Sequence, residues 1–281
     1  MLGAMSTDAR TPPRLLSIAG SDSGGGAGIQ ADLKAFAACG VHGMTAITAV
    51  TAQNTERVSA VYPLPPEAIV EQVRAVAEDI GVDAVKIGMV GNAAAIEAVL
   101  EALELLPADV PVVLDPVMVA ESGGRLLESE AERSLRERLV PRATVVTPNL
   151  MEAAALAGLG AEADPGELAR AVHALGPRMV VVTGGHRVAG GDLFYDGARL
   201  VEIPGERHPD GAAHGSGCTH SSVLAAQLAL GAEPLEAARR AHELAAAAVA
   251  AGLRGIGHGP GPVDVLAGAA ATRPREQPSR G

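Results

Sequence analysis

The feature that most constrains the fold is an alternation of short β-branched apolar runs with longer segments of helical periodicity. Four of the apolar runs follow one another in the middle of the chain, at residues 84–87, 112–115, 144–147 and 179–182. Helical segments lie between and before them, at residues 67–79, 93–105, 129–139, 150–157 and 167–175. Strand–helix–strand units of this kind form parallel sheets that helices cover on both faces. We therefore expect an α/β fold with a central, mostly parallel sheet.

The flanking segments extend this pattern. Strands are predicted over residues 15–19 and 45–50, and helices over residues 29–38, 221–229 and 233–251. Weak alternation over residues 58–62 suggests a small flap strand, and residues 192–203 suggest a hairpin that turns at Asp196 and Gly197. We expect a disordered N-terminal tail over residues 1–14, a single domain over residues 15–266, and a disordered C-terminal tail over residues 267–281.

The composition narrows the class of partner. The formal net charge is −11 and aromatic residues make up 1% of the chain. Nucleic acids and anionic membranes select basic patches, and single strands select aromatic platforms, so we expect neither as a partner. No apolar run reaches the ~20 residues of a membrane span. Cys39 and Cys218 lack metal-ligand spacing, which fits a reducing cytoplasm.

Ligands of such sheets bind outside the carboxyl ends of the strands. Polar or glycine-rich residues follow most of the predicted strands, at residues 20–22, 53–54, 88–89, 115, 149 and 184–185. We therefore expect one site along this edge, built from segments that are far apart in the sequence.

Residues 214–222 run from a glycine-rich turn into an Ala/Leu-rich helix. Unpaired N–H groups and the helix dipole make such a helix start an anion site, suited to the oxygens of a transferring phosphoryl group. The same field would partly ionise the Cys218 thiol. The alternative is a plain turn before a core helix, with Cys218 as a small buried apolar residue.

Asp115, Asn149 and Glu152 lie at neighbouring strand ends and suggest a Mg²⁺ site, because Mg²⁺ takes few carboxylates together with phosphate oxygens. The alternative for Asn149 and Glu152 is a capping box that only starts a helix.

The first glycine loop partly matches a dinucleotide fingerprint through Gly26, Gly28 and Ala31. The acidic residue that should close the second strand is absent there, where Gln53 and Asn54 stand instead. A Walker-type phosphate loop is absent from the sequence as well. These features together describe a kinase that binds ATP without a Walker loop.

Residues 17–34 resemble the opening signature of the hydroxymethylpyrimidine/phosphomethylpyrimidine kinases of thiamine biosynthesis, which belong to the ribokinase-like superfamily. The resemblance continues over residues 51–55, 86–89, 114–118, 147–153 and 214–219. It spans residues 15–263, and several long motifs in the same order are far more specific than any one of them.

The resemblance implies a ribokinase-like fold and an enzyme that uses ATP and Mg²⁺. It phosphorylates the hydroxymethyl arm of an aminopyrimidine and then adds a second phosphate. It also implies a homodimer. The substrate-binding residues would be Gly20, Asp32, Gln53, Met89 and Val117, with Asp32 and Gln53 bonded to the polar edge of the ring.

The resemblance also implies the residues of the phosphate half. Gly215, Ser216, Gly217 and Cys218 would form the catalytic anion hole, with Cys218 where sugar kinases of the superfamily have an aspartate base. The phosphates of ATP would be bound by Asn149, Glu152, Thr183 and Gly185, and Mg²⁺ by Asp115 and Glu152. A neutral thiol would not repel the anionic phosphate that is the second acceptor, which is our hypothesis for Cys218.

The chain departs from the family pattern at two positions. Thr183 stands where the family usually has a lysine, and Ala213 stands where it usually has a threonine. The first change removes a positive charge near the phosphates, so Mg²⁺ or another group must compensate. Two alternatives therefore stay open: a pyridoxal or pyridoxine kinase of the same superfamily, and a degenerate kinase that binds a pyrimidine without turnover.

Overall fold

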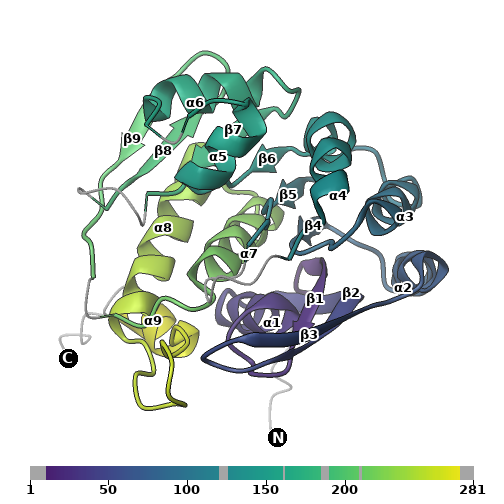
Figure 1. Ribbon diagram of the computed structural model, residues 1–281, viewed down its shortest axis with the longest axis horizontal. Coiled ribbons are helices and arrows are strands. Elements are labelled where there is room, and N and C mark those ends of the chain that lie inside the picture. The colour runs from purple at the N-terminus through teal and green to yellow at the C-terminus, as the bar shows by residue number, and fades with distance from the viewer. Residues whose placement is uncertain (1–10, 120–125, 161, 185–189, 209–210, 273–281) are drawn as a thin grey trace, which may run out of the picture.

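The computed structural model describes residues 11–119, 126–160, 162–184, 190–208 and 211–272 (Figure 1). Its centre is a nine-stranded sheet in the order β3-β2-β1-β4-β5-β6-β7-β8-β9. The strands are β1 (Arg14–Asp22), β2 (His42–Gln53), β3 (Val58–Pro63), β4 (Ala84–Ile87), β5 (Val112–Leu114), β6 (Val145–Val146), β7 (Met179–Val182), β8 (Asp192–Tyr195) and β9 (Leu200–Ile203). The six strands from β2 to β7 in this order pair in parallel, while β3, β8 and β9 join antiparallel at the two edges.

Helices cover both faces, as the alternating sequence pattern predicts. One layer contains α2 (Pro66–Asp79), α3 (Ala93–Leu103), α4 (Ser129–Ser134), α5 (Leu150–Ala157) and α6 (Pro165–His173). The other contains α1 (Gly28–Ala38), α7 (Ser216–Ala229), α8 (Pro234–Ala250) and α9 (Val265–Thr272). In this second layer α7 and α8 lie side by side (Figure 1).

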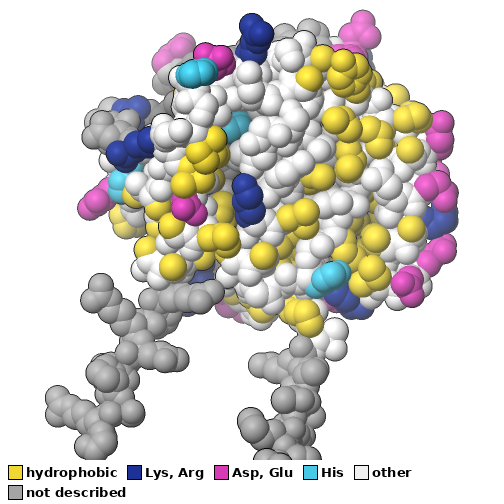
Figure 2. Space-filling view, turned by 90° about the horizontal axis from the view of Figure 1, so that it is seen from below, with side chains coloured by type: hydrophobic (Ala, Val, Ile, Leu, Met, Phe, Trp, Pro, Cys, Tyr) yellow, Lys and Arg dark blue, Asp and Glu magenta, His cyan; other side chains and the backbone are white. Residues whose placement is uncertain are grey.

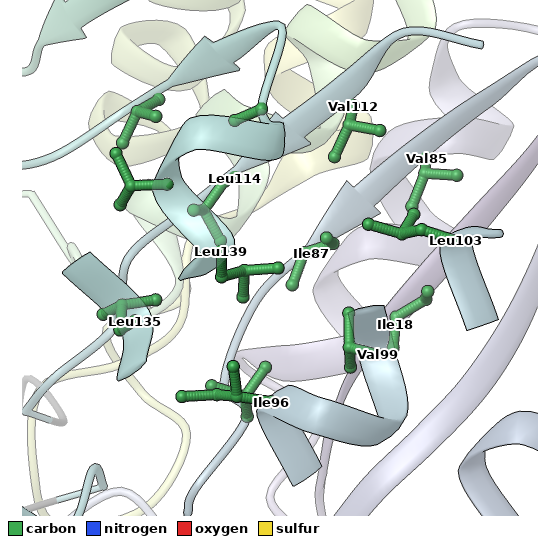
Figure 3. Close-up of a cluster of buried hydrophobic side chains, with 14 of the residues drawn as sticks. Ile18, Val85, Ile87, Ile96, Val99, Leu103, Val112, Leu114, Leu135 and Leu139 are labelled. Carbon is green, nitrogen blue, oxygen red and sulfur yellow. The ribbon is translucent and has the colours of Figure 1, made fainter. Parts of the chain in front are cut away.

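Each central strand sends neighbouring side chains to opposite cores. Leu15 packs beneath the α1–α7–α8 layer, while Leu16 packs beneath the α2–α6 layer. In β5, Val112 packs beneath the α2–α6 layer and Val113 beneath the α1–α7–α8 layer. Figure 3 shows the α2–α6 side, where Ile87 and Leu114 of the sheet meet Ile96 of α3 and Leu139. Burial on both faces explains why these strands read as continuous apolar runs.

Several helix starts have a local chemical cause. Proline occupies the first turn of α2, α6 and α8, where its missing N–H costs no helical bond. The side chains of Asn92 and Asp164 accept backbone N–H bonds at the starts of α3 and α6.

Most predicted elements are confirmed, and some boundaries move. The strands of residues 84–87 and 179–182 and the helix of residues 150–157 are found at the predicted residues. The flap strand is β3, paired with β2, and the hairpin is β8–β9, with Gly197 at a φ of +90° in its turn. The helix of residues 129–139 is α4 followed by a π-helical turn over Leu135–Leu139.

The predicted domain limits are too narrow at both ends. Arg14 already belongs to β1, and the expected C-terminal tail from residue 267 includes most of α9, which packs on α8. The rest of that predicted tail, residues 273–281, and residues 1–10 lie outside the described part of the chain. In the described part, no helix is both long and apolar enough to cross a bilayer.

Candidate active site

A cavity of about 810 Å³ opens along the carboxyl ends of the parallel strands, where the sequence predicts the site. Its walls include residues at the carboxyl ends of β1 and β2 and residues that follow β4, β5, β6 and β7, together with the start of α7 and one side of α8. The volume is within the range of small-molecule sites, about 300–1,000 Å³. One continuous cavity therefore joins motifs that are spread over most of the chain.

The start of α7 is held in place by a close contact between two glycines. Gly215 precedes the helix with a φ of +86°, and a Cβ there would collide with the carbonyl oxygen of Gly26. The Ser216 N–H donates to Ala213, while in the described part of the chain the N–H groups of Gly217 and Cys218 have no backbone acceptor. Because all four of these predicted catalytic residues line the cavity, the helix start offers its free N–H groups to a ligand there.

The first glycine loop is organised by Asp22, which the sequence places at a strand end of the site without indicating its role. Its buried carboxylate accepts the N–H groups of Gly24 at 2.7 Å, Gly26 at 3.0 Å and Ala27 at 2.9 Å. The Nε2 atom of His214 lies 3.3 Å from the same carboxylate. These bonds and His214 hold the Asp22 pKa below its ordinary value, although burial opposes them. Asp22 thus joins the loop after β1 to the start of α7.

Cys218 is a neutral thiol, which corrects the expectation that the helix start partly ionises it. Burial raises its pKa to about 12, and the charges of Asp32 and Asp115 act in the same direction. The Lys86 ammonium and an N–H bond from Gly28 oppose this rise without overcoming it. The charge hypothesis for Cys218 requires such a neutral thiol.

Asp32 lies beneath the cavity, not in its wall, which differs from its predicted contact with the ring. The side chain is fully buried and accepts bonds from Ser17 at 2.6 Å, Ser222 at 2.8 Å and the Lys86 ammonium at 2.9 Å. The hydrogen bonds of this carboxylate are thus made to the protein's own side chains. Asp32 therefore supports the floor of the site from below.

Lys86 is the cationic partner in this buried network and itself lines the cavity. Burial alone would lower the pKa of its ammonium group, but the charges of Asp32 and Asp115 raise it overall. Lys86 therefore stays protonated and offsets the two carboxylates near Cys218.

The other four predicted substrate-binding residues come together in one half of the cavity. Gly20, Gln53, Met89 and Val117 all line it. A Cβ at Gly20 would lie 3.0 Å from the Met89 sulfur, so glycine leaves room for that side chain. Thr51 donates to the side-chain Oε1 of Gln53 at 3.2 Å, which leaves the Nε2 donor of the Gln53 amide for a ligand. This half offers one amide and two apolar surfaces, which suits a small polar ring.

Asn149 and Glu152 form the capping box that the sequence offered as an alternative to a metal site. The Asn149 side chain accepts the Glu152 N–H, and Glu152 accepts the Asn149 N–H, both at 2.9 Å. Both residues still line the cavity with Asp115, so the cap does not remove them from the site. Burial raises the pKa of both carboxyl groups, and the charge of Asp115 helps to raise that of Glu152 to about 8.

Thr183 also lines the cavity, next to Asn149, with which it forms an isolated parallel bridge. Gly185, the other predicted phosphate-binding residue, lies outside the described residues. Ala213 lines the cavity before Gly215. Among the described residues, Asp192, His220 and His242 also line the cavity near Thr183, and the sequence analysis selected none of them. They come from β8, α7 and α8, so no local motif could have indicated them.

Comparison with known proteins agrees with this geometry. A family model described as phosphomethylpyrimidine kinase matches residues 22–264. The hydroxymethylpyrimidine/phosphomethylpyrimidine kinase of Streptomyces coelicolor is 48% identical over 257 residues, which cover 90% of this chain and 94% of the relative.

Two solved structures share the fold over nearly the whole chain. An ADP complex of Bacillus subtilis pyridoxal kinase has a TM-score of 0.83 and 37% identity, covering 93% of this chain and 100% of its own. A Staphylococcus aureus pyridoxal kinase in complex with AMP-PCP and pyridoxal has a TM-score of 0.82 and 34% identity, covering 91% and 94%. The ribokinase-like architecture, the site at the strand ends and the match over residues 22–264 lead to one conclusion: this chain belongs to the phosphomethylpyrimidine kinase family.

Proposed function

We propose that this enzyme transfers the terminal phosphoryl group of ATP to the hydroxymethyl arm of 4-amino-5-hydroxymethyl-2-methylpyrimidine, and then phosphorylates that product to the diphosphate. The observation that carries this proposal is that the free N–H groups at the start of α7 and the Gln53–Met89 half face the same cavity. A phosphoryl group and a small ring can therefore meet there.

The two halves have separate tasks. Gln53 hydrogen-bonds the polar edge of the ring, and Met89 and Val117 pack on its faces, which aims the hydroxymethyl arm at α7. The N–H groups of Gly217 and Cys218 stabilise the charge of the transferring phosphoryl group. Because phosphoryl transfer has a loose transition state, positioning and charge neutralisation supply most of the catalysis.

The donor set suits Mg²⁺ as part of a nucleotide complex. The described residues contain no group of three His, Cys, Asp or Glu side chains that could enclose a metal ion. Two carboxyl groups in one cavity, with the pKa of both raised, gain from a cation that the oxygens of a nucleotide also coordinate. Asp115 and Glu152 would hold Mg²⁺, which would neutralise phosphate charge.

Asn149 and Thr183 complete the proposed nucleotide half. Asn149 follows β6 and Thr183 follows β7, two neighbouring strands of the sheet, and both residues line the cavity. ATP use is supported by the AMP-PCP complex of the S. aureus pyridoxal kinase, which has the same fold.

The pyrimidine is favoured over pyridoxal as the acceptor. Identity to the S. coelicolor pyrimidine kinase is 48%, against 37% and 34% to the two pyridoxal kinases. The proposal includes a homodimer, which light scattering would test. Apolar side chains exposed at the β2–β3 edge, Val50, Val61 and Tyr62, support it.

The test is incubation of the protein with Mg²⁺–ATP and either the pyrimidine or pyridoxal, followed by mass spectrometry. We expect the pyrimidine monophosphate to appear first and the diphosphate after it. Pyridoxal phosphate as the sole product would assign the enzyme to the sibling activity. Binding of the pyrimidine without any transfer would identify a degenerate kinase.

A further inference from the structure

Two imidazoles surround one buried carboxylate in the cavity wall, apart from the residues given roles above. Asp192 begins β8, and its Oδ1 accepts the Gly184 N–H at 2.9 Å. Its Oδ2 lies 3.0 Å from Nδ1 of His242 in α8 and 3.0 Å from Nε2 of His220 in α7. Elements from three parts of the chain converge on this carboxylate, which is 3% exposed.

His220 has ring nitrogens without a hydrogen-bond partner. The side chain is 4% exposed and lines the cavity. Its Nε2 faces Asp192 without the alignment of a hydrogen bond, and its Nδ1 has no partner in the part of the chain that the structure describes. Native proteins pair nearly all buried polar atoms, so an unpartnered imidazole in a cavity wall points to a ligand.

His242 is placed differently. Its Nδ1 is bonded to Asp192, and its Nε2, which also has no hydrogen-bond partner in the described part of the chain, packs against Gly205. His242 therefore positions Asp192, and His220 is the member of the cluster that lies on the same helix as the N–H groups of Gly217 and Cys218.

The place of His220 on α7 indicates which part of a ligand it meets. Ser216 and His220 are four residues apart and lie one turn from each other on α7. His220 therefore lies close to the helix start, whose free N–H groups are proposed to hold phosphate oxygens. On the neighbouring helix α8, Ala245, Ala246 and Val249 add an apolar surface to the same cavity.

Positive charge is scarce in this part of the wall. Among the described lysines and arginines, Lys86 and Arg207 line the cavity, and Lys86 is committed to Asp32 while Arg207 is exposed. Thr183 is neutral. The hydrogen bond to Asp192 raises the pKa of His242, and both imidazoles hold the Asp192 pKa well below its ordinary value against burial. A hydrogen-bond donor such as His220 is therefore a further means of binding phosphate oxygens in this part of the wall.

We propose that His220, oriented by Asp192 and His242, donates a hydrogen bond to the polyphosphate of the donor nucleotide. This inference rests on the proposed function, in which ATP is the donor. His220 is then a nucleotide-binding residue, and Asp192 and His242 are positioning residues.

The test compares the binding of AMP-PCP, ADP, AMP and adenosine to the unmodified enzyme and to His220→Leu, without any pyrimidine present. We expect His220→Leu to weaken AMP-PCP binding by about 10- to 100-fold, the effect of losing one charge-assisted bond. The loss should shrink as phosphates are removed, and adenosine binding should change less than about 2-fold. His220→Gln, which keeps a donor, should recover part of the affinity. The matched control is His42→Leu, an exposed position at the start of β2, which should leave all four affinities unchanged.

Unchanged AMP-PCP affinity in His220→Leu, or an equal loss for adenosine, would overturn the inference. If the variants do not fold, NMR of ¹⁵N-histidine in the unmodified enzyme decides: the ring signals of His220 should shift with AMP-PCP and not with adenosine. Absence of that shift would also overturn it. The binding assay contains no acceptor, so it tests this inference separately from the proposed function. If AMP-PCP binds through His220 but the enzyme does not phosphorylate the pyrimidine, the proposed acceptor is rejected and this inference stands.

Discussion

Burial sets the charge state of the residues beneath the cavity floor. Lys86 and Asp32 are fully buried as an ion pair, and the same environment keeps Cys218 neutral and raises the Asp115 pKa. The floor thus presents an uncharged thiol to the acceptor, above a charge pair that is closed to water. A substrate that arrives with its own negative charge meets no thiolate there.

Cys218→Asp tests this view of the thiol. A carboxylate about 4 Å from an anionic phosphate is repelled by about 4 kcal/mol at an effective dielectric constant of about 20. We expect the second phosphorylation to fall at least 100-fold while the first stays within about 10-fold. Steady-state kinetics with each acceptor would measure this, and neutral Cys218→Ser should keep both steps. Loss of the first step alone would contradict the account.

Lys86→Met tests the buried pair. It leaves Asp32 as an uncompensated buried charge, which typically costs about 3–5 kcal/mol of unfolding free energy. The chain's other lysine is the control: Lys34 is exposed and donates one bond to Gly25, so Lys34→Met should cost about 1 kcal/mol or less. Denaturant titration at pH 7 gives both values. Equal stability of the two variants would show that the pair does not hold the floor.

The start of α7 is the element on which the proposed catalysis depends. Its direction is fixed by Gly215, which has a positive φ and packs on the Gly26 carbonyl, and by the Asp22–His214 contact. No side chain caps this helix, so its N–H groups stay available to a ligand. Gly215 and Gly26 thus allow the backbone to approach closely enough to set the direction of the helix start.

Gly215→Ala should therefore lower kcat/KM by at least 100-fold, because the helix start must move away from Gly26. The matched control is Gly231→Ala at the end of the same helix, where φ is +85° and no atom lies within 4 Å of an added Cβ. That change costs about 1 kcal/mol of backbone strain and should leave kcat/KM nearly unchanged. Similar kinetic losses in the two variants would refute a specific role for the α7 start.

The sequence predicts an element or a site residue well where a local pattern determines it, and poorly where only the tertiary fold does. The strands of residues 84–87 and 179–182 are buried on both faces, so their apolar runs mark their limits. Asp32 was placed in the wrong environment because a motif gives no information on whether a helix side chain faces a cavity or lies beneath it. Asp192, His220 and His242 meet only through the tertiary fold.

The helix α9 has an Ala/Gly-rich sequence without clear amphipathic periodicity, and it forms where Gly268 lets it approach Ala248 of α8 closely.

At the scale of the whole molecule, one sheet carries the site and two helical layers hold it. The cavity wall draws on both layers, since Glu152 belongs to α5 and His242 to α8. The outer surface agrees with the net charge of −11: on the face in Figure 2, the few Lys and Arg side chains are scattered among apolar and acidic ones.

The helix α9 is part of this whole, and its removal should destabilise the enzyme. A chain that ends at Asp264 loses the buried side chains of Val265 and Ala269 and exposes part of α8. We expect its melting temperature to fall by about 5–10 °C, measured by calorimetry. A chain that ends at Thr272 keeps α9 and should melt within about 1 °C of the full chain. Equal melting temperatures of the two chains would show that α9 does not contribute to the stability of the folded domain.

The central claim is that one cavity phosphorylates both the alcohol and the phosphate acceptor. The most direct measurement is the inhibition of diphosphate formation from the pyrimidine monophosphate by the unphosphorylated pyrimidine, with Mg²⁺–ATP saturating. If both acceptors occupy the Gln53–Met89 half in turn, inhibition is competitive and its constant equals the KM of the alcohol as a competing substrate. Diphosphate formation that continues undiminished at saturating alcohol would contradict a shared site.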